Sequence, residues 1–177
     1  MAGVPHSPEL SLRGAAAADL PAIRALVRSS YALYVERIGK EPAPMTHDYA
    51  RSLAHDRVWV AEAVRTSPAP AGGAPRSPGR TGLLGLLITV DAGDHLLLEN
   101  VAVAPEAQGT GLGRVLLARA EQDARDLGHT RIELYTNAAM TENLAYYPRR
   151  GYVEVDRRTE DGFERVYFVK TLVPRGA

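Results

Sequence analysis

A short glycine-rich stretch near the middle of the chain could bind an anion. Residues 108–113 read Gln-Gly-Thr-Gly-Leu-Gly and follow an apolar run that ends at Pro105. The pattern after them is helical, so the glycines stand where a helix begins. Glycine leaves backbone N–H groups unobstructed, and a helix N-terminus adds its partial positive charge. These features predict a cradle for a phosphorylated ligand, with a plain turn whose glycines serve tight packing as the alternative.

The spacing of these glycines excludes two common phosphate-binding motifs. The dinucleotide fingerprint Gly-x-Gly-x-x-Gly would need a glycine where Arg114 or Leu116 stands. The P-loop of nucleoside triphosphatases ends in Lys followed by Ser or Thr, a pair that this turn lacks. A nucleotide-binding protein is therefore a distant alternative for this chain.

One carboxylate within the apolar run could move a proton. Strand alternation would place Glu99 on the same face as Val101 and Val103. A carboxylate among aliphatic side chains must either reach solvent or have a task, so Glu99 is either a solvent-edge residue or a general base. Weaker candidates for the base are His95, Glu133 and Tyr135.

The patterns around these residues predict a single α/β domain over residues 1–177. Strands are expected at residues 10–13, 57–64, 83–90, 95–104, 131–136, 152–158 and 163–172. Helices are expected at residues 15–38, 46–54, 111–127 and 141–147, with a rigid connector at 41–44. Residues 66–82 are rich in Pro, Gly, Ser and Ala without an apolar period, which predicts a flexible loop between two strands.

The composition narrows the class of protein. The chain has 177 residues, zero formal net charge, 45% hydrophobic residues and no cysteine. These values fit a globular domain, exclude disulfides and thiolate nucleophiles, and argue against a broad basic surface for nucleic acid. No apolar run reaches membrane-spanning length, and the histidines lack metal-ligand spacing. We therefore expect a cytoplasmic protein without a metal site and without nucleic-acid or membrane partners.

Two blocks of the sequence resemble the GNAT superfamily of N-acyltransferases. In that family an aliphatic strand and a proline precede Gln/Arg-x-x-Gly-x-Gly/Ala at a helix start, and Gln108, Gly111 and Gly113 fill these positions here. The family's later Tyr-x-x-x-Gly-aromatic ending is matched by residues 147–152. The resemblance implies a mixed, mostly antiparallel twisted sheet of about seven strands, flanked by helices and splayed between its fourth and fifth strands.

By this resemblance, acetyl-CoA is the expected co-substrate. Its pyrophosphate would lie on backbone N–H groups of residues 109–114, and its pantetheine arm would follow the backbone of residues 101–103. The family's usual pantetheine-contacting Asn is replaced by Met140, so Asn137 or Asn143 is the expected substitute. The residues expected to bind the donor are Val101, Ala102, Val103, Gln108, Gly109, Thr110, Gly111, Leu112, Gly113, Arg114 and Asn143.

The same resemblance implies acetyl transfer to a primary amine of a small molecule or peptide, by direct attack in a ternary complex. Tyr147 occupies the position of a general acid that protonates the leaving sulfur, with a core tyrosine as the alternative, and Glu99 is the leading base. Tyr31 and Tyr34 are expected to frame the acceptor pocket. A non-catalytic acyl-CoA-binding sensor or regulatory module is the alternative function. Homodimers are common in the family, although no feature of this sequence requires one.

Overall fold

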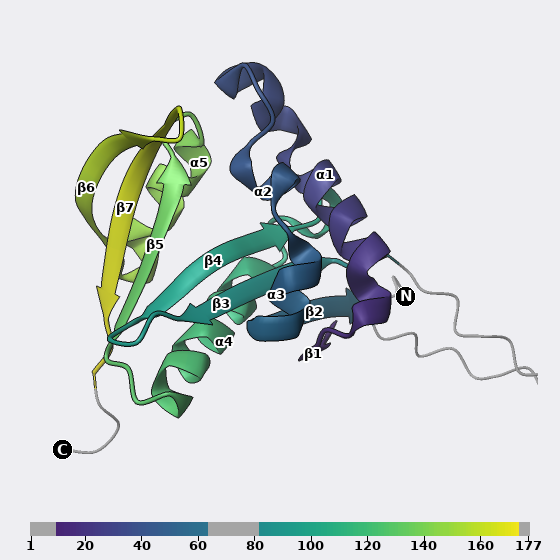
Figure 1. The fold of residues 1–177 in the computed structure, drawn as a ribbon, viewed down its shortest axis with the longest axis horizontal. Helices are drawn as coiled ribbons and strands as arrows, with labels where there is room; N and C mark the ends of the chain where they lie inside the picture. The colour runs from purple at the N-terminus through teal and green to yellow at the C-terminus, as the bar shows by residue number, and fades with distance from the viewer. Residues whose placement is uncertain (1–9, 64–81, 174–177) are drawn as a thin grey trace, which may run out of the picture.

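The computed structural model describes residues 10–63 and 82–173, which form a seven-stranded sheet flanked by helices (Figure 1). The strands are β1 (Leu10–Gly14), β2 (Arg57–Ala63), β3 (Gly85–Asp91), β4 (Leu96–Val103), β5 (Arg131–Asn137), β6 (Val153–Glu160) and β7 (Phe163–Thr171). Their order is β1-β2-β3-β4-β5-β7-β6, and every neighbouring pair is antiparallel except β4 and β5. The expected mixed, mostly antiparallel sheet is thereby confirmed. The predicted loop at 66–82 lies, except for its last residue, outside the described residues.

Helices cover both faces of this sheet. They are α1 (Leu20–Ile38), α2 (Ala43–Thr46), α3 (Tyr49–His55), α4 (Leu112–Asp126) and α5 (Thr141–Tyr146). Helices α1 and α3 pack on strands β2 to β4 from one side, and α4 packs on β3 and β4 from the other (Figure 1). The helix predicted at 46–54 begins instead at Tyr49, because the Asp48 side chain accepts the Arg51 N–H at 3.2 Å and caps it. Within the described ranges, no helix has both the length and the apolar character needed to cross a membrane.

The sheet divides between its two parallel strands. β4 and β5 pair only at Leu96 with Ile132 and at Leu97 with Glu133. Beyond these pairs the strands diverge, and Figure 1 shows β4 continuing towards α1 while β5 stays with β7. The expected splay between the fourth and fifth strands is confirmed.

Helix α1 supplies hydrogen bonds to the free edge of β4. The Ser30 hydroxyl donates to the carbonyl oxygen of Val103 at 3.0 Å. The single proton of the Tyr31 hydroxyl lies between two acceptors, Asn100 Oδ1 at 2.9 Å and the Val101 carbonyl oxygen at 3.2 Å. Backbone carbonyls that lose a strand partner need another donor when they are shielded from water. These two side chains therefore help β4 to remain apart from β5.

A β-bulge interrupts β4 at Glu99. Across the pair of strands, Ile88 lies opposite Asn100 and Thr89 lies opposite Leu98, so Glu99 is an extra residue without a partner on β3. A bulge of this kind turns two successive side chains towards the same side of the sheet and reverses the alternation that follows.

The bulge places Glu99 on a different face from the two valines. Glu99 and Asn100 both contact the segment that contains α2 and α3. Val103 faces α4, because it pairs with Gly85, and a Cβ on Gly85 would meet the α4 side chains Leu112 and Leu116. Val101 is two residues earlier on the same face. The prediction that Glu99 shares a face with Val101 and Val103 is therefore wrong, since simple alternation cannot account for the extra residue.

A buried carboxylate ties α4 to the first half of the sheet. Asp123 is 0% exposed, and its oxygens accept hydrogen bonds from Trp59 on β2 at 2.9 Å and from Thr89 on β3 at 2.9 Å. Arg119, one turn earlier on α4, donates to it at 3.0 Å and stacks its guanidinium 3.9 Å from the centre of the Trp59 ring. Donors from two strands and one helix thus meet at one carboxylate, which fixes α4 relative to β2 and β3.

Replacing this carboxylate should destabilise the fold strongly. Asp123→Ala leaves its donors without an acceptor in the core, so we expect the free energy of unfolding to fall by about 3–5 kcal/mol. Urea denaturation measures the change. Asp126→Ala, one turn later on the same helix, is the control and should cost less than about 1 kcal/mol, because exposed ion pairs contribute little. Equal losses in the two variants would show that Asp123 has no special role.

Candidate active site

The glycine-rich turn presents unpaired backbone amides at the start of α4. Gly109 and Gly111 have φ angles of +77° and +91°, a left-handed conformation that other residues adopt at a cost of about 1–2 kcal/mol. Among the amides of residues 109–113, only that of Thr110 has a described hydrogen-bond acceptor, the Ala107 carbonyl at 3.4 Å. The remaining amides are donors that an anion can use at the helix N-terminus.

This turn lines an open groove of about 450 Å³ between α1, β4 and the α5 region. The expected donor-site residues that line it are Val101, Ala102, Val103, Gln108, Gly109, Gly111, Gly113, Arg114 and Asn143. Thr110 and Leu112 do not, because the Thr110 hydroxyl donates to the Ala107 carbonyl at 2.7 Å and the Leu112 side chain is buried against Gly85. Leu112 can offer a ligand only its backbone N–H group, and the Thr110 N–H is already paired with the Ala107 carbonyl.

Arginine and tyrosine side chains complete the groove near the turn. Its charged lining residues are Arg114, Arg150 and Glu142, so positive charge is in excess there, which suits an anionic ligand. The Tyr146 ring lies 5.1 Å from the Arg150 guanidinium, and its hydroxyl lies only 2.9 Å from where a Cβ on Gly113 would be. Gly113 therefore allows Tyr146 to approach the start of α4, a packing reason for this glycine that its sequence position alone does not reveal.

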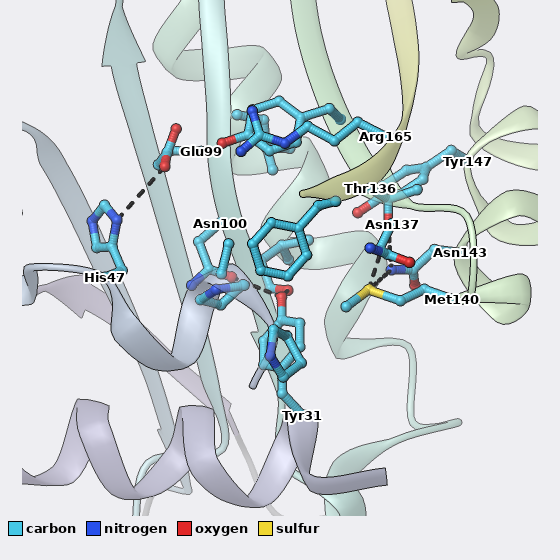
Figure 2. Close-up of a pocket in the computed structure, with 17 residues that line it drawn as sticks. Tyr31, His47, Glu99, Asn100, Thr136, Asn137, Met140, Asn143, Tyr147 and Arg165 are labelled. Carbon is cyan, nitrogen blue, oxygen red and sulfur yellow. Dashed lines mark hydrogen bonds and ion pairs between the residues drawn. The ribbon is translucent and has the colours of Figure 1, made fainter. Parts of the chain in front are cut away.

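A second cavity, of about 100 Å³, opens in the split between β4 and β5 (Figure 2). Its walls come from the segment around α2, from β4 and β5, and from the start of β7. Four residues line both this cavity and the groove, namely Tyr31, Val101, Asn143 and Tyr147. The two spaces therefore meet inside the split, where a ligand in one can reach a ligand in the other.

The two tyrosines expected at an acceptor pocket have different surroundings. Tyr31 lines both spaces, and its hydroxyl donates to Asn100 Oδ1 at 2.9 Å. Tyr34 lines only the groove, where its hydroxyl lies 3.4 Å from Glu142 Oε2 and its ring 5.5 Å from the Arg37 guanidinium. The geometry places Tyr31 at the junction and Tyr34 beside the glycine turn's groove.

Tyr147 stands at the junction with a protonated hydroxyl. The residue is 5% exposed, and its ring packs 5.7 Å from that of Tyr152 and 5.6 Å from that of Phe168. Burial raises the pKa of the Tyr147 hydroxyl well above its ordinary value of 10.0. Within the described part of the chain this hydroxyl has no hydrogen-bond partner, and it points into the cavity (Figure 2). It can therefore donate a hydrogen bond to a ligand at the junction.

Glu99 faces the same cavity from the opposite side (Figure 2). Its carboxylate is half-buried, and burial raises its pKa above the ordinary 4.5, an effect partly offset by the nearby His47 and Arg165. The His47 Nδ1 atom lies 3.7 Å from Glu99 Oε1. A carboxylate with a raised pKa binds a proton more readily, so Glu99 is suited to accept one from a ligand in the cavity.

Asn100 is a site residue that the sequence patterns did not identify. It is 5% exposed, accepts a hydrogen bond from Tyr31 and donates one to the Tyr49 hydroxyl at 2.9 Å. The Tyr49 hydroxyl donates in turn to the Pro44 carbonyl at 2.6 Å. This buried chain joins α1, β4, α3 and the α2 segment around the cavity. The signal in the sequence is a second polar residue directly after Glu99 in an otherwise apolar run.

The structure distinguishes the two asparagines near Met140. Asn143 lines both spaces, and its Nδ2 donates to Thr136 Oγ1 at 3.0 Å and approaches Met140 Sδ at 3.6 Å. Asn137 lines only the cavity, and its Oδ1 accepts the Ala139 N–H at 2.9 Å. Asn143 is therefore better placed than Asn137 to contact a ligand that extends from the groove. Its Oδ1 is the atom that can accept a hydrogen bond from such a ligand.

The weaker base candidates lie in different places. His95 pairs with Asp94 at 2.6 Å and lies 3.5 Å from Glu133, and neither His95 nor Glu133 lines the cavity. Tyr135 does line it, with the Arg165 guanidinium 4.5 Å from its ring centre. Of the candidate carboxylates, only Glu99 therefore faces the junction.

A family model described as Acetyltransferase (GNAT) family matches residues 22–152. The chain is 34% identical to the mycothiol acetyltransferase of Pseudarthrobacter chlorophenolicus, over a match that covers 41% of this chain and only 28% of that protein. The structure of the ribosomal-protein-S18-alanine N-acetyltransferase of Escherichia coli superimposes with a TM-score of 0.67 at 20% identity, covering 95% of this chain and 97% of that one. The structure of the PaiA N-acetyltransferase of Thermoplasma acidophilum in complex with coenzyme A superimposes with a TM-score of 0.68 at 14% identity, covering 92% of this chain and 99% of that one. These two solved structures share the fold of this chain.

Removing the charge of Glu99 should stabilise the folded protein at neutral pH. Because burial raises its pKa, the folded state binds this proton more tightly than the unfolded state, and stability falls as the pH rises above 4.5 through the folded-state pKa. Glu99→Gln removes that loss. Urea denaturation should therefore show a higher free energy of unfolding for the variant than for the wild type at neutral pH, and no difference in acid. The exposed Glu106→Gln is the control and should leave stability unchanged. A less stable Glu99→Gln at neutral pH would mean that the His47 contact outweighs burial.

Proposed function

The chain belongs to the GNAT family of acetyltransferases, and we propose that it transfers an acetyl group from acetyl-CoA to a primary amine by direct attack in a ternary complex. The observation that carries this proposal is the junction of groove and cavity in the split between β4 and β5. A donor in the groove and an acceptor in the cavity would meet beside Val101 and Tyr147. The chain contains no cysteine that could carry the acetyl group, which agrees with direct attack.

Coenzyme A fits the groove through three kinds of contact. Its pyrophosphate would bind the unpaired amides among residues 109–113, with Arg114 and Arg150 adding positive charge. Its pantetheine arm would lie along the free edge of β4, within reach of Asn143. A strand residue presents its N–H and its carbonyl on the same edge, so both of these groups of Val101 face the split between β4 and β5. The Val101 N–H can then donate to the thioester oxygen as negative charge develops there.

The cavity suits a slender primary amine, as the end of a small molecule or of a peptide. Glu99 places a negative charge opposite the junction, where it would attract an ammonium group. Pro42, Pro44 and Phe163 supply apolar walls. We assign Tyr31 to the contact with the acceptor, and Tyr34, which lines only the groove, to the donor side.

Proton movement would then run from the acceptor to Glu99 and from Tyr147 to the sulfur. Glu99 takes one proton from the ammonium, which frees the nitrogen lone pair to attack the thioester carbon. As the tetrahedral intermediate collapses, the C–S bond breaks and the Tyr147 hydroxyl donates to the departing thiolate. The second proton lost by nitrogen restores the hydroxyl, so the products are the amide, the free thiol and one proton held by Glu99.

A thiol-release assay with acetyl-CoA and a panel of primary amines tests this function. We expect thiol release with at least one amine and, by calorimetry, binding of acetyl-CoA that Gly113→Ala weakens about tenfold by displacing Tyr146. Gly14→Ala is the matched control, because a Cβ there meets open space. Binding of acetyl-CoA without thiol release from any amine would favour a non-catalytic acyl-CoA-binding module, and tighter binding of ATP would contradict both.

Substitution of Tyr147 should slow the chemical step without weakening donor binding. Tyr147→Phe keeps the buried ring and removes the hydroxyl, so we expect kcat to fall about 10²-fold while the affinity for acetyl-CoA is unchanged. In the wild type the rate should rise with pH as Glu99 ionises and should not fall before pH 10, because burial keeps Tyr147 protonated. Unchanged turnover of Tyr147→Phe across this range would refute its role as the acid.

A further inference from the structure

His47 lies between the active-site cavity and a second opening on the surface. It is in the short link between α2 and α3, and its Nδ1 atom is 3.7 Å from Glu99 Oε1 (Figure 2). A separate cavity of about 260 Å³, beside α1, is lined by Arg24, Arg28 and His47 among others. Of the residues that line the two cavities, His47 is the one they share. It therefore connects the carboxylate with a second route to solvent.

The far side of the imidazole ring is fixed by Ser52. The His47 Nε2 atom lies 2.8 Å from the Ser52 hydroxyl, which is on α3 in a residue that is 2% exposed. The Tyr49 ring packs edge-on against the imidazole with centres 4.9 Å apart. When Nε2 carries the proton and donates it to Ser52 Oγ, the lone pair of Nδ1 faces Glu99 and can accept a proton from it. These contacts therefore hold the His47 ring in an orientation in which Nδ1 can accept a proton from Glu99.

The proposed reaction requires that Glu99 lose a proton after each turnover. In the proposed function, on which this inference rests, Glu99 keeps one proton from the ammonium at each turnover and must lose it before the next. The acceptor occupies the cavity in front of Glu99, so direct exchange with water is hindered while substrate is bound. His47 approaches the carboxylate from a different side and leads to the outer cavity.

We propose that His47 is a proton relay that returns Glu99 to its ionised form by carrying its proton to the outer cavity. Protonated Glu99 transfers its proton to Nδ1, which gives an imidazolium and a carboxylate. The imidazolium then loses its Nε2 proton to a water or buffer base of the outer cavity, and proton exchange with solvent returns the ring to the Nε2–H tautomer before the next turnover. His47 acts through Glu99 and does not contact the reacting atoms, so it is a positioning and relay residue.

The charged surroundings of His47 come from several elements. The titratable and charged groups beside it are Glu99 on β4, Arg24 and Arg28 on α1, and Asp48 and Tyr49 at the start of α3. Arg165 on β7 and Asp56 act on it indirectly, through their electrostatic effect on Glu99. The two arginines make the outer cavity a suitable entry for an anionic base such as phosphate.

His47→Gln should make turnover dependent on the buffer. With the most active amine of the panel and saturating acetyl-CoA, we expect kcat to fall about tenfold. Raising the phosphate concentration at constant ionic strength should restore part of this loss, because phosphate reaches Glu99 in place of the relay. The wild type should not respond to phosphate, and the rising limb of the pH–rate profile of His47→Gln should move to higher pH, since His47 lowers the pKa of Glu99.

Control variants separate a relay from a structural role. His55→Gln, an exposed histidine at the end of α3, should behave as the wild type. Ser52→Ala should show a smaller loss with the same phosphate response, which covers the case in which His47→Gln folds poorly. Tyr147→Phe should be slow at every phosphate concentration. A loss in His47→Gln that phosphate and pH leave unchanged, or no loss at all, overturns the relay. A wild type without thiol release for any amine overturns the proposed function itself.

Discussion

The early separation of two parallel strands is the constraint on which the rest of the structure depends. β4 and β5 share two residue pairs and then diverge, although unpaired backbone groups inside a protein are costly. Helix α1 meets part of this cost, because the Ser30 hydroxyl donates to the Val103 carbonyl and the Tyr31 hydroxyl, shared with Asn100, lies 3.2 Å from the Val101 carbonyl. The sheet can therefore carry a passage through its middle. In a continuous sheet, the hydrogen bonds of β5 would occupy the edge on which we place the pantetheine arm.

The proposed acid and base belong to opposite halves of the divided sheet. Glu99 lies on β4, in the half that Asp123 ties to α4, whereas Tyr147 is held by Tyr152 and Phe168 in the half that contains β5 and β7. The space between the two side chains is consequently set by how the halves are held together. A carboxylate kept half-buried in that space has its pKa raised, which reduces stability at neutral pH while it favours proton acceptance.

The parts of the site that are local in sequence were predictable. Gly109 and Gly111 need a backbone conformation that glycine adopts easily, and the helix that follows makes their neighbours' amides into donors, so the turn could be recognised from six consecutive residues, 108–113. The face of Glu99 could not be predicted in this way. A bulge depends on the register with β3, and alternation along β4 assumes one partner for every residue. The same limit applies to Tyr34, because helical spacing orders the side chains of α1 without showing which space each one meets.

The sequence alone predicts the order of elements, the glycine turn at a helix start, the family resemblance and the type of reaction, because these depend on backbone propensity and side-chain chemistry within short segments. Only the fold decides which side chains meet. Tyr31 and Tyr49 are 69 and 51 residues from Asn100, yet both bond to it and shape the cavity. His47 and Glu99 likewise come together only because the segment that contains α2 and α3 contacts β4 through individual side chains. Contacts over such distances arise from the packing of whole elements, and that packing depends on many weak interactions that no short segment contains.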